Sequence, residues 1–204
     1  MIDQSILRLI AITDDIRDGR SGLIDRARLA VEGGATSIQL RLKDVAARDL
    51  VNVARHLVES VAVPVIVNDR ADVAIAAGAA GVHLGRDDLP VRAVRVFAPA
   101  GFLIGCSVGS DAEVEAAVGA DYAGVGPVFT TLSKSDAGAA LGVEEFNRLA
   151  TATGLPAVGI GGITSANAHS VIDGGAAGVA VVAAVFGSSD PLAAAQELSR
   201  AIGR

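Results

Sequence analysis

The stretch Gly174-Gly175-Ala176-Ala177-Gly178-Val179-Ala180-Val181-Val182, residues 174–182, passes through glycines and alanines into a short and wholly apolar run. Glycine commonly follows the end of a helix, because it adopts the left-handed backbone conformation at little cost. An apolar run without polar alternation is typical of a strand covered on both faces, as in a parallel sheet. The stretch therefore predicts the end of a helix, a glycine turn and a buried strand.

Similar units recur along the chain. Glycine turns of the same kind lie at residues 32–35, 77–81 and 119–121. Apolar residues spaced three and four apart predict helices between the strands, for example at Leu23–Val31 and Leu50–Val61. The runs that we expect to form strands are Leu9–Thr13, Ser37–Arg41, Val65–Asn68, Gly81–Leu84, Leu103–Ser107, Tyr122–Val125, Ala157–Ile160 and Gly178–Val182.

Eight strands that alternate with helices predict a (β/α)8 TIM barrel, forming a single α/β domain over residues 1–204. An open, doubly wound parallel sheet is the alternative. Eight regular units with no change of pattern favour the closed barrel. Asp72, Ser110 and Ser165 stand where the helices that follow would need N-caps.

The composition favours a soluble cytoplasmic protein. Of the 204 residues 51 % are apolar and 3 % aromatic, and the formal charge of −6 disfavours a nucleic-acid binder, which would present a basic face. Cys106 is the single cysteine; it excludes a disulfide within the chain, and we interpret it as a small core residue. The longest uncharged apolar stretch, residues 174–186, is too short to span a membrane, and residues 1–4 lack the basic region of a signal peptide. Exposed apolar helix faces are common in barrels, so a homodimer is possible.

Basic side chains follow two of the predicted strands. In a barrel of this kind the working residues lie at the carboxyl ends of the strands. Only two of the seventeen basic residues are lysines, and both Lys43 and Lys134 stand where an apolar run gives way to a loop. At period two, Gln39, Arg41 and Lys43 would all point to one side, toward the barrel axis or its mouth. A bound anion would pair with these groups; the alternative is a solvated strand end.

Carboxylates follow the next two strands. Asn68-Asp69 ends the third predicted strand, and Asp87-Asp88 follows the fourth. Carboxylates from adjacent strand ends can hold a hard cation together with phosphate oxygens and water. For each aspartate alone a helix cap is the alternative. His83, inside the fourth strand, is interpreted as a hydrogen-bonded barrel residue rather than a metal ligand.

A second anion site is predicted after the last two strands. Residues 159–163 and 181–184 would offer backbone N–H groups at the usual phosphate site of this barrel. The long polar connection from Gly126 to Leu141 is predicted to be a mobile active-site loop. Ser107 ends the fifth predicted strand, where its hydroxyl would lie at the mouth or form a cap. No Ser/His/Asp or Cys/His arrangement is visible in the sequence.

The chain resembles the family of thiamine phosphate synthases and TenI-like proteins, nearly from end to end. The motifs that carry the resemblance are Ile12-Thr13-Asp14, Gln39-x-Arg41-x-Lys43, Asn68-Asp69-Arg70-x-Asp72, Gly81-Val82-His83-Leu84-Gly85-x-x-Asp88, Gly105-x-Ser107, Asp121-Tyr122-x-x-x-Gly126-Pro127-Val128-Phe129, Thr131-x-Ser133-Lys134 and Gly159-Ile160-Gly161-Gly162-Ile163.

The resemblance implies a transferase of thiamine biosynthesis that joins hydroxymethylpyrimidine diphosphate to a thiazole phosphate. It implies Mg²⁺ held by Asp69 and Asp88, with Mn²⁺ as the alternative, since oxygen ligands accept both. Ser107 would face the reacting groups, and Gln39 would bind the pyrimidine. The basic and amide groups implied to hold the diphosphate are Arg41, Lys43, Asn68 and Lys134, with Lys134, Ser107 and Arg41 catalytic. The groups implied to hold the thiazole phosphate are Thr131, Ser133, Gly162, Val182 and Ala183.

Three positions depart from the usual family pattern. Ser133 replaces a threonine and keeps its hydroxyl, Ala183 replaces a common serine of the phosphate site, and Thr130 replaces a frequent proline. A loop of the form Thr-Leu-Ser-Lys also occurs among TenI-like proteins, some of which are thiazole tautomerases. The characterised tautomerases have histidine where this chain has Pro127. A synthase is therefore favoured over a tautomerase or a non-catalytic paralogue that binds thiamine phosphate.

Overall fold

The structure is a computed structural model that describes residues 3–13, 19–131 and 138–203. Its eight strands are parallel and close into a barrel in chain order, with the last strand paired to the first. This confirms the predicted (β/α)8 barrel over the open sheet. The strands are β1 (Leu9–Ile12), β2 (Ser37–Leu40), β3 (Val65–Asn68), β4 (Gly81–Leu84), β5 (Leu103–Val108), β6 (Tyr122–Val125), β7 (Ala157–Ile160) and β8 (Gly178–Val181).

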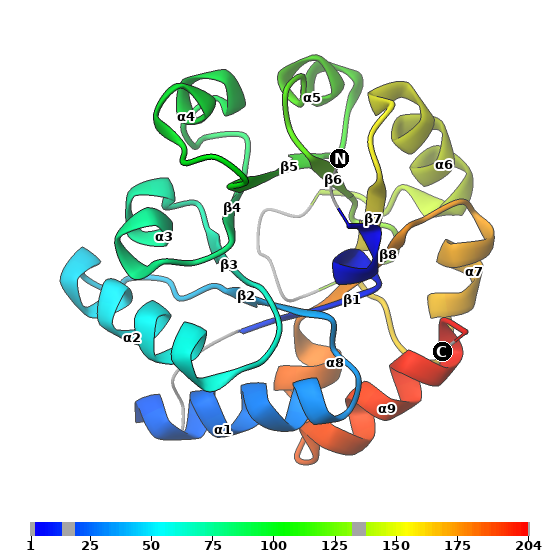
Figure 1. Cartoon of the computed structure of the whole chain (residues 1–204). Coiled ribbons are helices and arrows are strands. Elements are labelled where there is room, and N and C mark those ends of the chain that lie inside the picture. Colours follow the sequence, from blue (N-terminus) through cyan, green and yellow to red (C-terminus); the bar gives the residue numbers. More distant parts are fainter. Residues whose placement is uncertain (1–2, 14–18, 132–137, 204) are drawn as a thin grey trace.

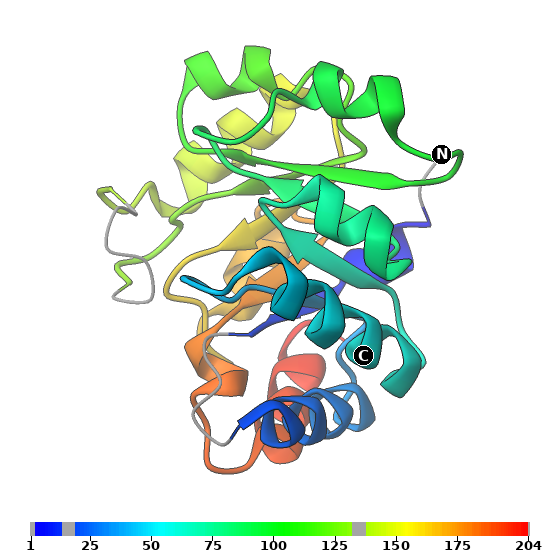
Figure 2. The same cartoon turned by 90° about the vertical axis from the view of Figure 1, so that its left-hand side faces the viewer.

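Helices surround the barrel on the outside (Figures 1 and 2). None of those in the described part of the chain combines the length and apolar character that crossing a membrane requires. They are α1 (Gly19–Glu32), α2 (Ala47–Ser60), α3 (Ala71–Ala77), α4 (Val91–Phe97), α5 (Asp111–Ala116), α6 (Gly142–Thr153), α7 (Ala168–Asp173), α8 (Ala183–Phe186) and α9 (Pro191–Ala201), preceded by the short 3₁₀ helix η1 (Gln4–Leu7).

The predicted strands agree with the observed ones at four of eight positions and differ by one residue at the others. β1 and β2 each end one residue early because, beyond the backbone bond from the Thr13 N–H to the Gln39 carbonyl, a side chain takes the place of the backbone ladder. The buried Thr13 hydroxyl donates to the Arg41 carbonyl at 2.9 Å and accepts from the Arg41 N–H at 2.8 Å. β5 continues to Val108, and β8 ends at Val181 before the chain enters α8.

Two of the three predicted helix caps are wrong. α3 begins after Arg70, so Asp72 lies inside its first turn, where it pairs with that arginine. α7 is preceded by Asn167 rather than Ser165, and the Asn167 side chain accepts from the Thr164 N–H. Ser110 does precede α5, but its hydroxyl donates to Glu113 instead of capping the backbone.

The barrel has two cores. The larger one lies between the strands and the surrounding helices. The smaller one fills the barrel interior, and it includes Leu7 of η1, Ile10, Ile66, Tyr122 and Val158. In Figure 1, η1 lies over the centre of the barrel, where the hydroxyls of Thr36 and Ser37 donate to the carbonyl of Ile6. This end of the barrel is therefore closed by apolar packing, which leaves the carboxyl ends of the strands for chemistry.

Candidate active site

Polar side chains occupy the inward-facing positions of β2 to β5. Strand register pairs Asn68 with His83, and Ser107 with Gly124 of β6, so these positions share one face of the sheet. Gln39 is buried, and its side-chain amide donates to the Asn68 side-chain oxygen at 2.8 Å. The structure thus brings together two residues that the family resemblance assigned to the pyrimidine and the diphosphate.

Strand alternation predicted that Gln39, Arg41 and Lys43 point to one common side. Of these three residues, only Gln39 lies within the observed strand β2. β2 ends at Leu40, and Asp44 turns the chain with a φ of 57°. Arg41 is half-buried and its backbone is held by Thr13, while Lys43 is exposed. The two basic residues therefore lie on the loop after β2, where their charges remain accessible at the edge of the barrel.

Asp69 and Asp88 follow adjacent strands, and neither is the N-cap of a helix. Arg70 precedes α3 and Pro90 precedes α4, so the alternative interpretation as caps is wrong. Asp69 has a φ of 65°, an uncommon conformation outside glycine, and its N–H donates to the carbonyl of His83 in β4. Asp88 is half-buried, and its Oδ2 atom accepts from the Gly85 N–H at 2.6 Å.

The arrangement of these carboxylates fits Mg²⁺. In the described residues no three His, Cys, Asp or Glu side chains cluster closely enough to form a metal cage by themselves. Mg²⁺ does not require such a cage, because it keeps several waters and binds through one or two carboxylates together with substrate phosphates. Asp69 and Asp88 offer hard oxygen ligands on neighbouring loops, with the second Asp88 oxygen anchored to Gly85. Such a donor set suits a metal that is shared with a bound phosphate.

The glycines after β7 have a packing role that the sequence did not reveal. A Cβ atom at Gly161 would lie 2.5 Å from Pro127 Cβ, and one at Gly162 would lie 2.5 Å from the Thr130 carbonyl oxygen. The segment after β6 crosses directly over them, with the Val128 N–H bonded to the Ile160 carbonyl at 2.8 Å. Glycine here permits close approach of two backbones.

Of the residues predicted to hold the thiazole phosphate, Gly162 lies at this crossing, next to Thr130. For the Gly162 N–H no acceptor is recorded within residues 3–13, 19–131 and 138–203. Val182 is half-buried and Ala183, the first residue of α8, is exposed. Thr131 is half-buried at the end of the described segment. Ser133 and Lys134 lie outside the described residues, so their predicted roles rest on the sequence.

Glu113 of α5 joins the loops that follow β4 and β5. It accepts from the Arg86 guanidinium at 2.7 Å, from the Gly109 N–H at 2.7 Å and from the Ser110 hydroxyl at 3.0 Å. Burial opposes its ionisation, but the hydrogen bonds from these three groups outweigh burial and lower the pKa of Glu113. The ionised carboxylate therefore holds the rim of the barrel beside Ser107.

Replacement of Glu113 by glutamine is expected to lower the free energy of unfolding by about 1–2 kcal/mol at neutral pH. The pKa of Glu113 is lower in the folded state than in the unfolded state. The ionised carboxylate therefore stabilises the fold at pH values above the unfolded-state pKa. This stabilisation is lost as the pH falls through the folded-state pKa. The difference between Glu113→Gln and the parent should therefore shrink between about pH 5 and pH 3. Urea denaturation across this range measures it. Glu115→Gln, an exposed change in the same helix, should show no such pH dependence.

Sequence reasoning missed a line of three hydrogen-bonded side chains. His83 Nδ1 lies 3.1 Å from the Tyr122 hydroxyl, and His83 Nε2 lies 3.1 Å from Ser107 Oγ. The line contains no aspartate, so it is not the Ser/His/Asp arrangement that the sequence analysis looked for, and the interpretation of His83 as a hydrogen-bonded barrel residue is confirmed. The available signal was the single tyrosine of the chain at an inward strand position. Cys106 is buried as predicted, and burial raises the pKa of its thiol to about 11.

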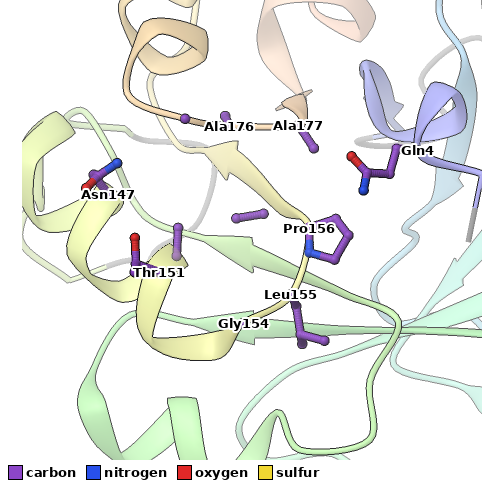
Figure 3. Close-up of a pocket in the computed structure, with 11 residues that line it drawn as sticks. Gln4, Asn147, Thr151, Gly154, Leu155, Pro156, Ala176 and Ala177 are labelled. Atoms are coloured by element: carbon purple, nitrogen blue, oxygen red, sulfur yellow. The ribbon is translucent and has the colours of Figure 1, made fainter. Parts of the chain in front are cut away.

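A surface hollow of about 390 Å³ lies away from these residues, at the amino ends of β7 and β8. Figure 3 shows Pro156 and Ala177 on one side of it and Asn147 on the other. The Asn147 side-chain amide already donates to the Gly174 carbonyl at 2.6 Å. Most of the remaining lining is alanine and glycine, so this hollow lacks the charged groups found at the opposite end of the barrel.

Known proteins resemble this chain over nearly its whole length. A protein-family model described as "Thiamine monophosphate synthase" matches residues 9–185. The thiamine-phosphate synthase of Methanoculleus marisnigri is 51 % identical over 196 residues, which are 93 % of this chain and 92 % of the relative. That of Roseiflexus castenholzii is 46 % identical over 192 residues, which are 92 % of this chain and 84 % of the relative.

Solved structures agree with this similarity. The thiamine phosphate pyrophosphorylase from Pyrococcus furiosus superposes with a TM-score of 0.86 at 37 % identity, covering 98 % of this chain and 96 % of the other. A 3-hexulose-6-phosphate synthase, at 18 % identity and a TM-score of 0.71, covers 96 % of this chain and 100 % of the other and shares the fold alone. By its sequence from β1 to α8 and by its structure, the chain belongs to the thiamine monophosphate synthase family.

Proposed function

We propose that this chain is a thiamine-phosphate synthase, the activity for which its relatives are named. The enzyme is a transferase that joins hydroxymethylpyrimidine diphosphate to a thiazole phosphate and releases pyrophosphate. The observation that carries the proposal is the Gln39–Asn68 pair, joined at 2.8 Å, with Asp69 and Asp88 on the loops that follow the neighbouring strands β3 and β4. It sets an amide that can recognise a heterocycle beside the carboxylates of a metal–phosphate site.

The reaction requires stabilisation of a leaving group more than activation of a nucleophile. The bond between the pyrimidine methylene carbon and the diphosphate oxygen breaks, and that bonding pair leaves with the diphosphate. The thiazole nitrogen supplies the new bonding pair and needs no general base. Negative charge therefore grows on the diphosphate, where preorganised cations and hydrogen-bond donors lower the barrier.

Each group in the proposed site either stabilises the charge on the diphosphate or binds a substrate. Asp69 and Asp88 would hold Mg²⁺, which when bound supplies positive charge to the diphosphate. Arg41, Lys43 and Lys134 add cationic side chains, and Asn68 adds an amide donor. The thiazole phosphate is assigned to the region of Thr131, Ser133, Gly162, Val182 and Ala183. Simultaneous binding of both substrates supplies much of the acceleration by positioning.

A pyrophosphate-release assay tests the proposal. The pyrimidine diphosphate and the thiazole phosphate are supplied singly and together, each with Mg²⁺ and with EDTA. Release is expected only when both substrates and the metal are present. Release that persists in EDTA would contradict the metal assignment while leaving the synthase intact.

Absence of release with substrates verified on an established synthase would contradict the synthase. The same preparation should then be tested for thiazole tautomerisation, which would proceed in EDTA, and for tight binding of thiamine phosphate without turnover. The residue at the tautomerase histidine position is Pro127, and its carbonyl is bonded to the Leu141 N–H at 2.8 Å. A proline at this position cannot transfer a proton, which favours the synthase.

A homodimer and a cytoplasmic location complete the proposal. α4 exposes Val96 by 87 % and Phe97 by 50 %, next to the exposed Arg92. α5 exposes Glu115. An antiparallel pairing of α4 with α5 of a second copy would cover the apolar residues and match these opposite charges, which sedimentation velocity can test.

A further inference from the structure

Ser107, His83 and Tyr122 form a continuous line from the barrel mouth into its interior. They come from β5, β4 and β6, and both hydrogen bonds measure 3.1 Å. Tyr122 is 1 % exposed and His83 is 8 % exposed, whereas Ser107 is half-buried. Only the serine end of the line is therefore accessible to a molecule bound at the mouth.

Two glycines on the inward face make room for this line. A Cβ atom at Gly105 would lie 2.2 Å from Tyr122 Cζ, and one at Gly124 would lie 2.9 Å from His83 Cε1. Each ring therefore occupies the space that a side chain on a neighbouring strand would fill. The ring centroids are 5.6 Å apart at an interplanar angle of 40°. Both rings are held by packing, so the hydrogen bonds join groups that cannot easily move apart.

The burial of Tyr122 decides which nitrogen of His83 carries a proton. Burial raises the pKa of the Tyr122 phenol, which therefore keeps its proton near neutral pH. Among the described residues, the one hydrogen-bond partner recorded for this hydroxyl is His83 Nδ1. A buried hydroxyl without an acceptor is costly, so the phenol donates to an unprotonated Nδ1. The neutral imidazole then carries its proton on Nε2 and donates it to Ser107 Oγ.

We propose that Tyr122 and His83 are positioning residues that fix Ser107 as a hydrogen-bond donor facing the substrates. With one lone pair of its oxygen occupied by the His83 N–H, the Ser107 hydroxyl directs its own proton toward the mouth. Resting on the proposed function, this assigns Ser107 the role of a donor to the departing diphosphate. It excludes the opposite arrangement, in which His83 would accept the serine proton and generate a nucleophile. A donor is what this reaction can use, since negative charge grows on the leaving group.

The tautomer is measured by ¹⁵N NMR of the imidazole groups in the free enzyme. The chain has three histidines, and the spectrum of His83→Gln identifies the resonances of His83. We expect a neutral ring protonated on Nε2 near neutral pH. A ring protonated on Nδ1, or on both nitrogens, would overturn the proposal. This result does not depend on turnover, so it is distinguishable from failure of the proposed synthase activity.

Kinetics of Tyr122→Phe, Ser107→Ala and the double variant test the coupling. Each single change is expected to lower kcat by about 10-fold or more with little change in KM, because donors to the leaving group act in the transition state. The double variant should be no slower than Ser107→Ala alone, since Tyr122 acts through the serine. Losses that multiply in the double variant would overturn the proposal.

A pair of His83 variants gives a second readout that is independent of Tyr122. The glutamine amide can reach the place of Nε2 and donate to Ser107, whereas asparagine reaches only the place of Nδ1. We expect His83→Gln to retain at least about 10-fold more kcat than His83→Asn when both are equally folded by circular dichroism. Equal activities of the two folded variants would contradict the proposed direction of donation.

Discussion

The variant Asp88→Asn is expected to lower kcat/KM for pyrophosphate release by about 10²- to 10³-fold while the fold is kept. Asparagine retains a side-chain oxygen that can accept from the Gly85 N–H, so the loop after β4 stays closed. The change removes the negative charge that would hold Mg²⁺ against the diphosphate. Activity at saturating and limiting Mg²⁺, together with Mn²⁺ binding followed by electron paramagnetic resonance, measures both consequences.

Asp87→Asn is the matched control for this change. Asp87 precedes Asp88 on the same loop, is exposed, and has no recorded partner in the part of the chain that the structure describes. Its replacement removes the same charge and should change kcat/KM by no more than about threefold. Full activity of Asp88→Asn, or equal losses in the two variants, would contradict Asp88 as a metal ligand.

Replacement of Lys134 should lower activity about as strongly as replacement of Asp88, although the role of Lys134 is predicted from the sequence alone. Lys134→Ala is expected to lower kcat by about 10²-fold or more, because it removes a cation from the proposed leaving group. Lys134→Arg keeps the charge and should recover part of the loss, though not all, since the guanidinium is broader than the ammonium. An unchanged kcat in Lys134→Ala would contradict its catalytic role.

The change Gly105→Ala is expected to have the largest effect on stability, lowering the free energy of unfolding by about 3 kcal/mol or preventing folding. The new methyl group would lie 2.2 Å from Tyr122 Cζ and 2.5 Å from its hydroxyl oxygen. The ring is 1 % exposed and packs inside the barrel, so the methyl group would overpack this core. Urea denaturation monitored by circular dichroism measures the change.

Two further variants separate overpacking from the general cost of replacing glycine. Gly154→Ala changes a residue with a φ of 64° and open space around its Cα, so it should cost only about 1 kcal/mol. Tyr122→Leu, added to Gly105→Ala, makes room for the methyl group and should recover part of the lost stability. Gly105→Ala as stable as Gly154→Ala would contradict the tight interior packing.

The order of elements could be predicted because its signals are local. Glycine turns and apolar runs occur within a few residues of each other, and they placed all eight strands to within one residue. The same signals could not predict the ends of β1 and β2. Those ends depend on Thr13, whose hydroxyl bonds the backbone of Arg41, 28 residues away.

The general place of the candidate site could also be predicted, because it follows from the topology of the barrel. In a closed barrel all strands end at the same edge, so polar residues after β2, β3, β4 and β5 are placed near one another by topology alone. Their individual surroundings were not predictable. Asp69 and Asp88 resembled helix caps in sequence, and only the structure shows the caps at Arg70 and Pro90.

By itself the sequence determined that this protein is a (β/α)8 barrel with a cluster of polar strand ends, because residue period and glycine placement are properties of short segments. The tertiary structure alone decided which side chains meet inside it. Gln39 and Asn68 are 29 residues apart, His83 and Ser107 are 24 apart, and His83 and Tyr122 are 39 apart. Their contacts depend on strand register and on the space left by Gly105 and Gly124, which no local pattern records.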